Sequence, residues 1–284
     1  MSAAQETMSF PQTSPSRSSL EWFDLVFFAI LSQVTLFNLW RHGKQGILGW
    51  FMLANFCILK VVGGAMTKSA QNSSQISTYT TGAIITSATL SPLYFAMLGV
   101  WHEVAMTYKQ NRPFLFGWSL QIIVHLVIAS AIALVIVGAA QYNNPTNPTS
   151  SAHALEIAGV ILFAMAWILF TFMVAALWRT KDLTAMEHRL LYAITICTPL
   201  LGLRTLYSIL GACINNPSWN FTNGGTIAEK VVLQVLPEVL ILIILNIGGV
   251  FPSSSETAFG TSSHRRGQGR LKRGSQARNI EMGL

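Results

Sequence analysis

Long apolar segments alternate with short polar ones along most of the chain. A helix rises about 1.5 Å per residue, so about 20 apolar residues cross a bilayer core about 30 Å thick. Seven segments reach this length, near 22–40, 47–66, 80–101, 114–139, 155–178, 190–211 and 229–251. This pattern predicts an all-α fold, an integral membrane bundle of seven transmembrane helices.

The predicted bundle occupies residues 21–251 and is flanked by two polar tails, 1–20 and 252–284, that we expect to be disordered. Only 10% of the 284 residues are charged, against about 25% in soluble domains. Three capping-box patterns predict helix starts, and they are Ser18 with Glu21, Thr184 with Glu187, and Thr226 with Glu229. Small residues predict close helix packing, namely Gly63, Gly64, Gly82 and Gly202.

Lysine and arginine concentrate in alternate loops and in the C-terminal tail. They are Arg41, Lys44, Lys109, Arg112, Arg179, Lys181 and Arg189, followed by Arg265, Arg266, Arg270, Lys272, Arg273 and Arg278. Because cytoplasmic loops carry the excess of positive charge, the N-terminus is predicted outside and the C-terminus in the cytosol. Two glycosylation sequons, at Asn72 and Asn220, fall in loops that this topology places outside.

Three charged side chains stand well inside predicted spans, where each costs at least about 2.5–3.5 kcal/mol unless it is paired. They are Lys60, Arg204 and Glu238. Arg204 and Glu238 belong to consecutive helices, and counting residues from the outer helix ends places them at similar depth. The sequence therefore predicts a buried Arg204–Glu238 ion pair, with Lys60 close enough to share Glu238.

Other polar residues predict an outward-facing cavity around this pair. Gln234 lies one turn above Glu238, and Tyr207 follows Arg204 by one turn. The candidate ligand-binding residues are Arg204, Glu238, Lys60, Gln234, Tyr207 and His125. Three alternatives stay open: the ion pair as a helix clamp, Lys60 extending toward the interface, and His125 as a hydrogen-bonded core histidine.

The remaining acidic residues have simpler predicted roles. Asp24, Glu156 and Glu229 are expected in first helical turns, where a carboxylate complements the helix dipole, and Glu103 is expected at the membrane interface. No two of the six histidines are four residues apart, so we expect no metal site. The chain has no G-x-S-x-G nucleophile elbow and no phosphate-binding loop, and we expect no cofactor and no enzyme activity. The basic tail is expected to contact anionic lipid rather than nucleic acid, because it has no aromatic residue after Phe259.

Helices 6 and 7 carry a family resemblance. Leu203-Arg204-Thr205-Leu206-Tyr207-Ser208, Leu236-Pro237-Glu238 and Asn246-Ile247-Gly248-Gly249 resemble uncharacterised fungal seven-helix membrane proteins. More distantly, the chain is similar to fungal lipid-translocating exporters (RTA-like proteins), which have an arginine in helix 6 and acidic residues in helix 7. The resemblance implies a fungal protein of lipid handling or stress resistance, with Arg204, Glu229 and Glu238 at family positions.

The function expected from these features is transport or translocation of a lipid or amphipathic small molecule. A seven-helix receptor outside the main G-protein-coupled family is an alternative, and a non-catalytic membrane scaffold is another. The expected partners are membrane lipids, and the expected location is the plasma membrane, with an internal membrane as the alternative.

Overall fold

The structure is a computed structural model of the chain that describes residues 15–73, 75–108, 118–142, 150–179, 185–213 and 226–249. Every secondary-structure element in these residues is a helix, and all of them belong to one compact unit, 1–250. Seven helical segments are long and apolar enough to cross a membrane: Ser18–His42, Gly46–Gln71, Ser77–Ala105, Leu120–Gln141, Ser151–Trp178, Glu187–Cys213 and Ile227–Gly249. The predicted seven-span, all-α architecture is confirmed, while the orientation of the two ends stays a prediction.

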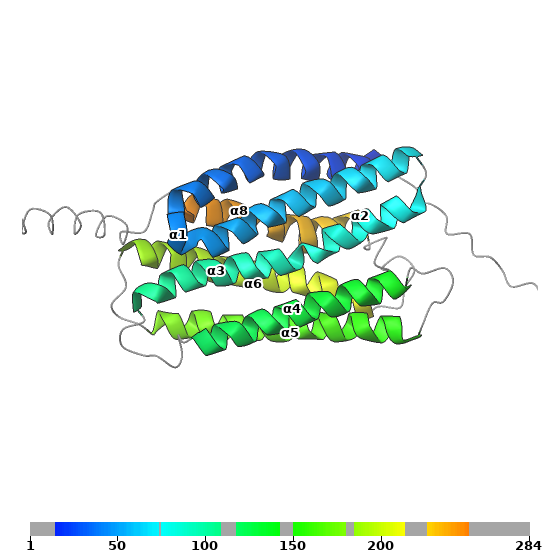
Figure 1. Cartoon of the computed structure of the whole chain (residues 1–284). Helices are drawn as coiled ribbons and strands as arrows, with labels where there is room; N and C mark the ends of the chain where they lie inside the picture. Colours follow the sequence, from blue (N-terminus) through cyan, green and yellow to red (C-terminus); the bar gives the residue numbers. More distant parts are fainter. Residues whose placement is uncertain are drawn as a thin grey trace, which may run out of the picture. The chain divides into compact units, whose positions relative to one another are not determined.

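The first two spans belong to one continuous helix, α1 (Pro15–Ser73), which folds back on itself between its two arms (Figure 1). Gln71 Nε2 donates to both carboxylate oxygens of Glu21 at 3.0 and 3.1 Å, and Lys68 Nζ donates to Ser18 Oγ at 2.5 Å. A straight helix would separate Gln71 from Glu21 by about 75 Å. The helix begins before Ser18, so residues 15–20 are helical and the predicted capping box at Ser18 is wrong.

The third span is made of two helices, α2 (Ile76–Ala88) and α3 (Leu90–Tyr108), that meet at Thr89. Pro92 has no backbone N–H, so the carbonyl of Ala88 lacks its helical donor. The hydroxyl of Ser91 donates to that carbonyl at 3.1 Å, and the hydroxyl of Thr89 donates to the Thr86 carbonyl at 2.6 Å. Side-chain hydroxyls thus satisfy the backbone at the break, as the apolar core of a membrane requires.

The remaining helices are α4 (Trp118–Tyr142), α5 (Ser150–Trp178), α6 (Ala185–Cys213), α7 (Ile227–Lys230), the π-helical turn η2 (Val231–Val235) and α8 (Leu236–Gly249). The capping box of Thr226 and Glu229 is confirmed: each residue's side chain accepts from the other's backbone N–H. Thr184 lies outside the described residues. Glu156 is the seventh residue of α5, so its predicted first-turn position is wrong.

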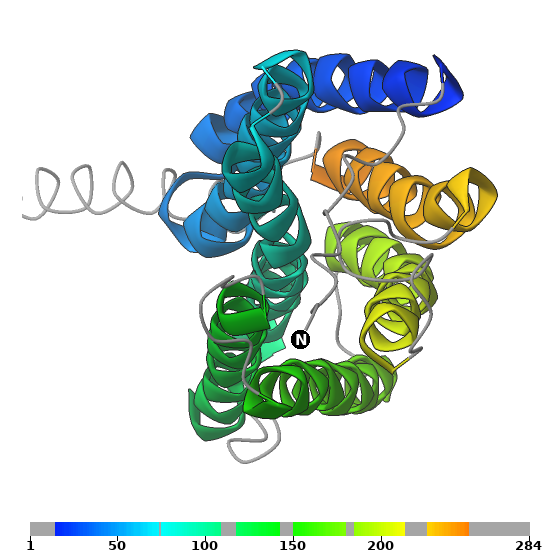
Figure 2. The same ribbon diagram turned by 90° about the vertical axis from the view of Figure 1, so that its right-hand side faces the viewer.

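Seen along the bundle, α8 lies between α1 and α6, and α4 and α5 pack side by side (Figures 1 and 2). Glycines allow several of these contacts. A Cβ on Gly63 would lie 2.5 Å from Thr86 Oγ1, and one on Gly202 would lie 2.9 Å from the Trp167 ring, whereas Gly64 faces open space. The predicted close packing is therefore confirmed at Gly63, Gly82 and Gly202 and wrong at Gly64.

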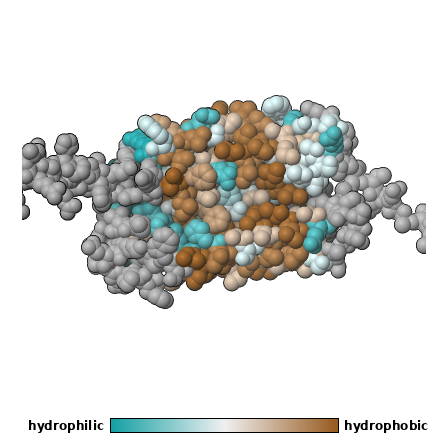
Figure 3. Space-filling view, viewed as in Figure 1, coloured by the Kyte–Doolittle hydropathy of each residue, from teal (hydrophilic) through white to brown (hydrophobic). Residues whose placement is uncertain are grey.

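Large apolar side chains cover the outside of the helices. Trp40, Ile30 and Ile168 are among many that are more than half exposed, and Figure 3 shows apolar residues across the middle of the bundle with more polar ones toward its ends. A surface of this kind is suited to lipid and not to water. Together with the seven spans, it identifies the chain as a multi-pass membrane protein.

Candidate functional site

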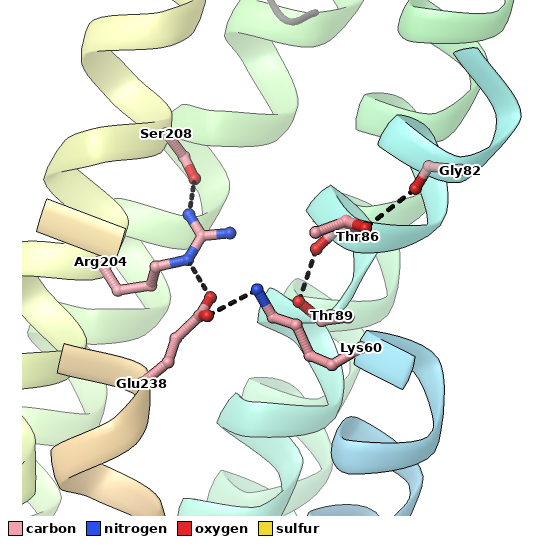
Figure 4. A network of polar contacts seen from close by, with 7 residues as sticks. All are labelled: Lys60, Gly82, Thr86, Thr89, Arg204, Ser208 and Glu238. Carbon is pink, nitrogen blue, oxygen red and sulfur yellow. Dashed lines mark hydrogen bonds and ion pairs between the residues drawn. The ribbon is translucent and has the colours of Figure 1, made fainter. Parts of the chain in front are cut away.

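Three charged side chains meet in the interior of the bundle (Figure 4). Glu238 Oε1 accepts from Arg204 Nε at 2.6 Å, and Lys60 Nζ lies 2.5 Å from Glu238 Oε2. No more than 3% of any of the three side chains is exposed. The predicted Arg204–Glu238 ion pair is confirmed, as is the expectation that Lys60 shares Glu238. We call these three residues the charged triad.

Each member of the triad comes from a different helix. Lys60 lies in the second arm of α1, Arg204 in α6 and Glu238 in the first turn of α8. Glu238 directly follows Pro237, which removes a backbone donor, and the turn before it, η2, is π-helical, with the N–H of Leu236 bonded to the carbonyl of Val231. A π turn holds one residue more than an α turn, so η2 sets which way α8 faces. Such turns are frequent at functional sites.

Both cations of the triad have further partners. Arg204 Nη1 donates to Ser208 Oγ at 2.8 Å, and its guanidinium lies 5.6 Å from the centre of the Tyr207 ring. Lys60 Nζ lies 5.6 and 5.9 Å from the ring centres of Phe28 and Phe56. Aromatic faces attract cations, most strongly where water is excluded. These contacts fix the position of both cations beside the carboxylate.

The triad carries one more positive than negative charge. Asp24 is a further carboxylate in these surroundings, and Lys60 acts on it more strongly than any other charged residue does. Asp24 is the tenth residue of α1, so its predicted place in a first turn is wrong, and its Oδ1 is buried with no hydrogen-bond partner. Asp24 therefore belongs to the electrostatic surroundings of the triad, and the sequence interpretation missed it.

The other predicted ligand-binding residues divide into two groups. Tyr207 contacts Arg204, and Gln234 is buried in η2 one turn before Glu238. His125, by contrast, bonds through Nδ1 to the Gln121 carbonyl at 2.7 Å and stacks on Phe95, so its described contacts stay within α4 and α3. The charged groups are closed off by neighbouring side chains, so the expected outward-facing cavity is not open at the triad.

A second polar cluster links the first arm of α1 to α8. Asn246 accepts at Oδ1 from Asn38 Nδ2 at 2.9 Å, and Asn246 Nδ2 lies 3.2 Å from Thr35 Oγ1. Asp24, Thr35, Asn38 and His42 repeat along α1 at intervals that keep them on one face of the helix. This polar stripe, visible in the sequence, could have indicated that α1 packs against α8.

A comparison with protein families gives one match, and it covers most of the chain. A profile described as a domain of unknown function (DUF7702) matches residues 16–254. The chain belongs to the DUF7702 family. The match includes every described helix of the bundle except the first residue of α1, Pro15. Comparisons with curated proteins and with solved structures find no match.

The DUF7702 domain contains a third polar cluster, at the end of the bundle where α1 folds back. His42 Nδ1 lies 3.0 Å from Glu103 Oε1, and His42 Nε2 lies 2.6 Å from the carbonyl of Gly249. Glu103 is buried, so the expectation that its side chain faces the membrane interface is wrong. Sequence reasoning missed this contact because the two residues are far apart in the chain and each stands near the end of a span.

No described part of the DUF7702 domain groups three or more His, Cys, Asp or Glu side chains in a way that could hold a metal ion. Of the two predicted glycosylation sites, Asn72 is the next-to-last residue of α1, and Asn220 lies outside the described residues. Both sites stay predictions.

Proposed function

We propose that this DUF7702 protein transports or translocates a lipid or an amphipathic small molecule, and that the charged triad binds the anionic part of that molecule. The main support for the proposal is the third charged residue, Lys60. A clamp between α6 and α8 needs only Arg204 and Glu238, and Lys60 adds a buried cation that such a clamp does not use. An excess buried cation is costly in a membrane, so a ligand anion would be bound strongly there.

The chemistry of the triad suits an anionic oxygen group. An arginine can donate two parallel hydrogen bonds to a carboxylate or a phosphate, and a lysine binds either one as a point charge. Glu238 occupies both cations in the closed structure, where it stands in for such an anion. A ligand would displace Glu238 or join it, which requires α8 to separate from α1 in part.

The position of the triad also favours a moving element. Glu238 follows a π turn and a proline, and both weaken the regular hydrogen bonding of the helix just before it. Broken helices in transporters place binding groups at such points. The segment η2 is therefore the proposed hinge of the site.

The resemblance to fungal lipid-translocating exporters supports a lipid-like substrate, since Arg204 and Glu238 hold the resembling positions and form the ion pair. Glu229, the third such position, caps α7. Membership in the DUF7702 family carries no activity with it. The fungal origin, the plasma membrane location, the contact of the basic tail with anionic lipid and the absence of enzyme activity are parts of this proposal.

The test uses the purified full-length protein in liposomes. We expect fluorescent lipids with anionic headgroups to cross the bilayer faster than in protein-free liposomes, and the Lys60→Met variant to lose most of this acceleration. Lys60→Met leaves the Arg204–Glu238 pair in place. If this variant folds but moves no lipid, Lys60 is needed for ligand binding and not for folding. Arg41→Met is the matched control, because Arg41 is exposed.

Two outcomes would contradict the proposal. If Lys60→Met moved lipid as fast as the unmodified protein, the triad would be a structural clamp. If the unmodified protein moved no lipid of any headgroup class, the receptor and scaffold alternatives would take its place, and cytosolic partners would be sought next.

A further inference from the structure

The His42 cluster lies apart from the charged triad and has a chemistry of its own. Glu238 and Gly249 are eleven residues apart, which is about 16 Å along α8. His42 comes from the first arm of α1, Glu103 from α3, and the third partner is the backbone carbonyl of Gly249, the last residue of α8. Three separate helices therefore meet at a single imidazole ring.

The Gly249 and Glu103 oxygens that lie against the two ring nitrogens of His42 are both acceptors. A carbonyl oxygen only accepts, so His42 Nε2 must carry a proton and donate to Gly249. Glu103 Oε1 lies 3.0 Å from Nδ1, and an ionised carboxylate also only accepts. A neutral imidazole has a single N–H, which Gly249 already uses. The contact to Glu103 therefore needs one further proton, carried either by Nδ1 or by the carboxyl group.

The surroundings of Glu103 favour the same proton. Its second oxygen, Oε2, is buried with no hydrogen-bond partner, and so is Nε1 of Trp50. A Cβ on Gly46 would meet Glu103 Oε2 at 3.0 Å and Trp50 Cδ1 at 2.9 Å, so both groups border Gly46. An ionised carboxylate that is buried with one oxygen unpaired is costly. A proton shared with His42 lowers that cost.

We propose that His42 and Glu103 form a proton-binding site that joins the end of α8 to α1 and α3. At neutral pH this site holds one proton in addition to the one that a neutral imidazole carries. The ligand of the site is the proton itself, and the inference is independent of the proposed transport function. Without that proton, a carboxylate would face the bare nitrogen of a neutral ring, and the contact between α1 and α3 at this end would become repulsive.

Other titratable groups stand at the same end of the bundle. Arg41 is exposed on α1, and His102 is next to Glu103 on α3; α6 begins here, with Glu187, His188 and Arg189 in its first turns. The α8 helix contributes the backbone carbonyl of Gly249 to His42. The ring centres of Trp50 and His42 lie 4.7 Å apart with the two planes tilted by 34°, and the indole blocks any side chain at position 249.

The proton has a defined effect on stability. An imidazole in an unfolded chain has a pKa of about 6.5, and the proposal requires the folded pair to hold its proton above that pH, where the unfolded chain has lost it. The folded state then binds more protons, and stability falls as the pH rises. For one proton, the unfolding equilibrium constant grows by up to about tenfold per pH unit.

The direct test counts the protons. In the full-length protein labelled with ¹⁵N-histidine, the resonance of His42 is assigned as the one that is absent from His42→Gln. At pH 8 we expect either both ring nitrogens protonated or a protonated carboxyl in the infrared spectrum, with that carboxyl band absent from Glu103→Gln. A neutral ring beside an ionised Glu103 would overturn the proposal.

The second test measures stability against pH. Glu103→Gln keeps a hydrogen-bonding partner for a neutral imidazole and needs no extra proton, so we expect it to fold and to lose the fall in stability between pH 6.5 and 8. His188→Gln, at the same end of the bundle, is the control and should keep the slope. An unchanged slope in Glu103→Gln would overturn the proposal even if that variant were less stable throughout.

Discussion

At the residue scale, the charged triad depends on its single anion. Glu238 pairs with two cations on two different helices, whereas each cation shares that single anion with the other. Removal of Arg204 or Lys60 leaves an intact pair and takes away the excess charge. Removal of Glu238 leaves two buried cations without the carboxylate that both of them contact. The three residues are therefore not equivalent, although all three are buried.

We expect Glu238→Ala to destabilise the protein by about 3–5 kcal/mol, the usual effect of leaving a buried charge without its partner. Lys60→Met and Arg204→Met should cost much less, because Glu238 keeps one cation in each. The measurement is the free energy of unfolding in mixed detergent for all three variants, with Arg41→Met as the exposed control. Equal losses in the three variants would show that the charges do not act as one unit.

The sequence predicted the triad because a charge inside an apolar span has few explanations, and residue counting gave similar depths for Arg204 and Glu238. It did not predict Asp24 or the His42–Glu103 pair. Asp24 and Glu103 lie close enough to span ends to be explained by a helix dipole or an interface. Only the packing of the helices shows that Glu103 is buried, and only the folding back of α1 brings Asp24 into the electrostatic surroundings of Lys60.

At the element scale, the hydrophobic pattern predicts the spans but not the interruptions within the helices. The seven spans were predicted with ends a few residues from the observed ones. The reversal between the first two spans was predicted, but as a loop and not as part of one helix. The break at Thr89 and the π turn η2 were not predicted, since each depends on local hydrogen bonding and not on hydropathy. Pro92 and Pro237 marked two of these places in the sequence without indicating what form the interruption takes.

The π turn gives a prediction about deletions. A π turn contains one extra residue, so deletion of Val232 from η2 should convert it to α-helix and leave Glu238 facing the triad. Deletion of Ile243 from the regular part of α8 should instead rotate Asn246 and Gly249 by about 100° away from α1. Folded protein is measured by size-exclusion chromatography and thermal unfolding, and the two deletions should differ sharply. Similar behaviour would mean that η2 does not set the direction of α8.

The crossing of α1 and α2 gives a prediction about two neighbouring glycines. A Cβ at Gly63 would lie 2.5 Å from Thr86 Oγ1 and 3.1 Å from the Gly82 carbonyl, whereas one at Gly64 would meet nothing within 4 Å. Gly63→Ala should therefore cost about 1–3 kcal/mol through overpacking. Gly64→Ala should be neutral or gain up to about 1 kcal/mol from helix propensity. Thermal unfolding of both variants checks this, and a tolerated Gly63→Ala would contradict the close approach.

At the scale of the whole molecule, α8 connects the two proposed sites. It holds Glu238 of the triad at one end, Asn246 in the middle and the carbonyl bonded to His42 at the other end. All three positions contact α1, so a displacement of α8 that opened the triad would also strain the His42 cluster. Ligand binding at one end and proton binding at the other would then influence each other through a single helix.

The direction in which the bundle crosses the membrane decides which site faces which compartment. Positive charge in alternate loops predicts that the α1 fold-back, and with it the His42 cluster, lies toward the cytosol. The triad then lies nearer the outer surface. Cys213, at the end of α6 that should face outward, is exposed, whereas Cys57 and Cys197 are buried.

The native cysteines therefore provide the test of orientation. A membrane-impermeant maleimide added to intact cells should label the protein at Cys213, and Cys213→Ser should abolish the labelling because the two buried thiols are protected. A second variant, Cys213→Ser with Ser275→Cys in the C-terminal tail, should be labelled only after the cells are permeabilised. Labelling of the tail in intact cells, together with protection of Cys213, would reverse the orientation and place the proton site outside.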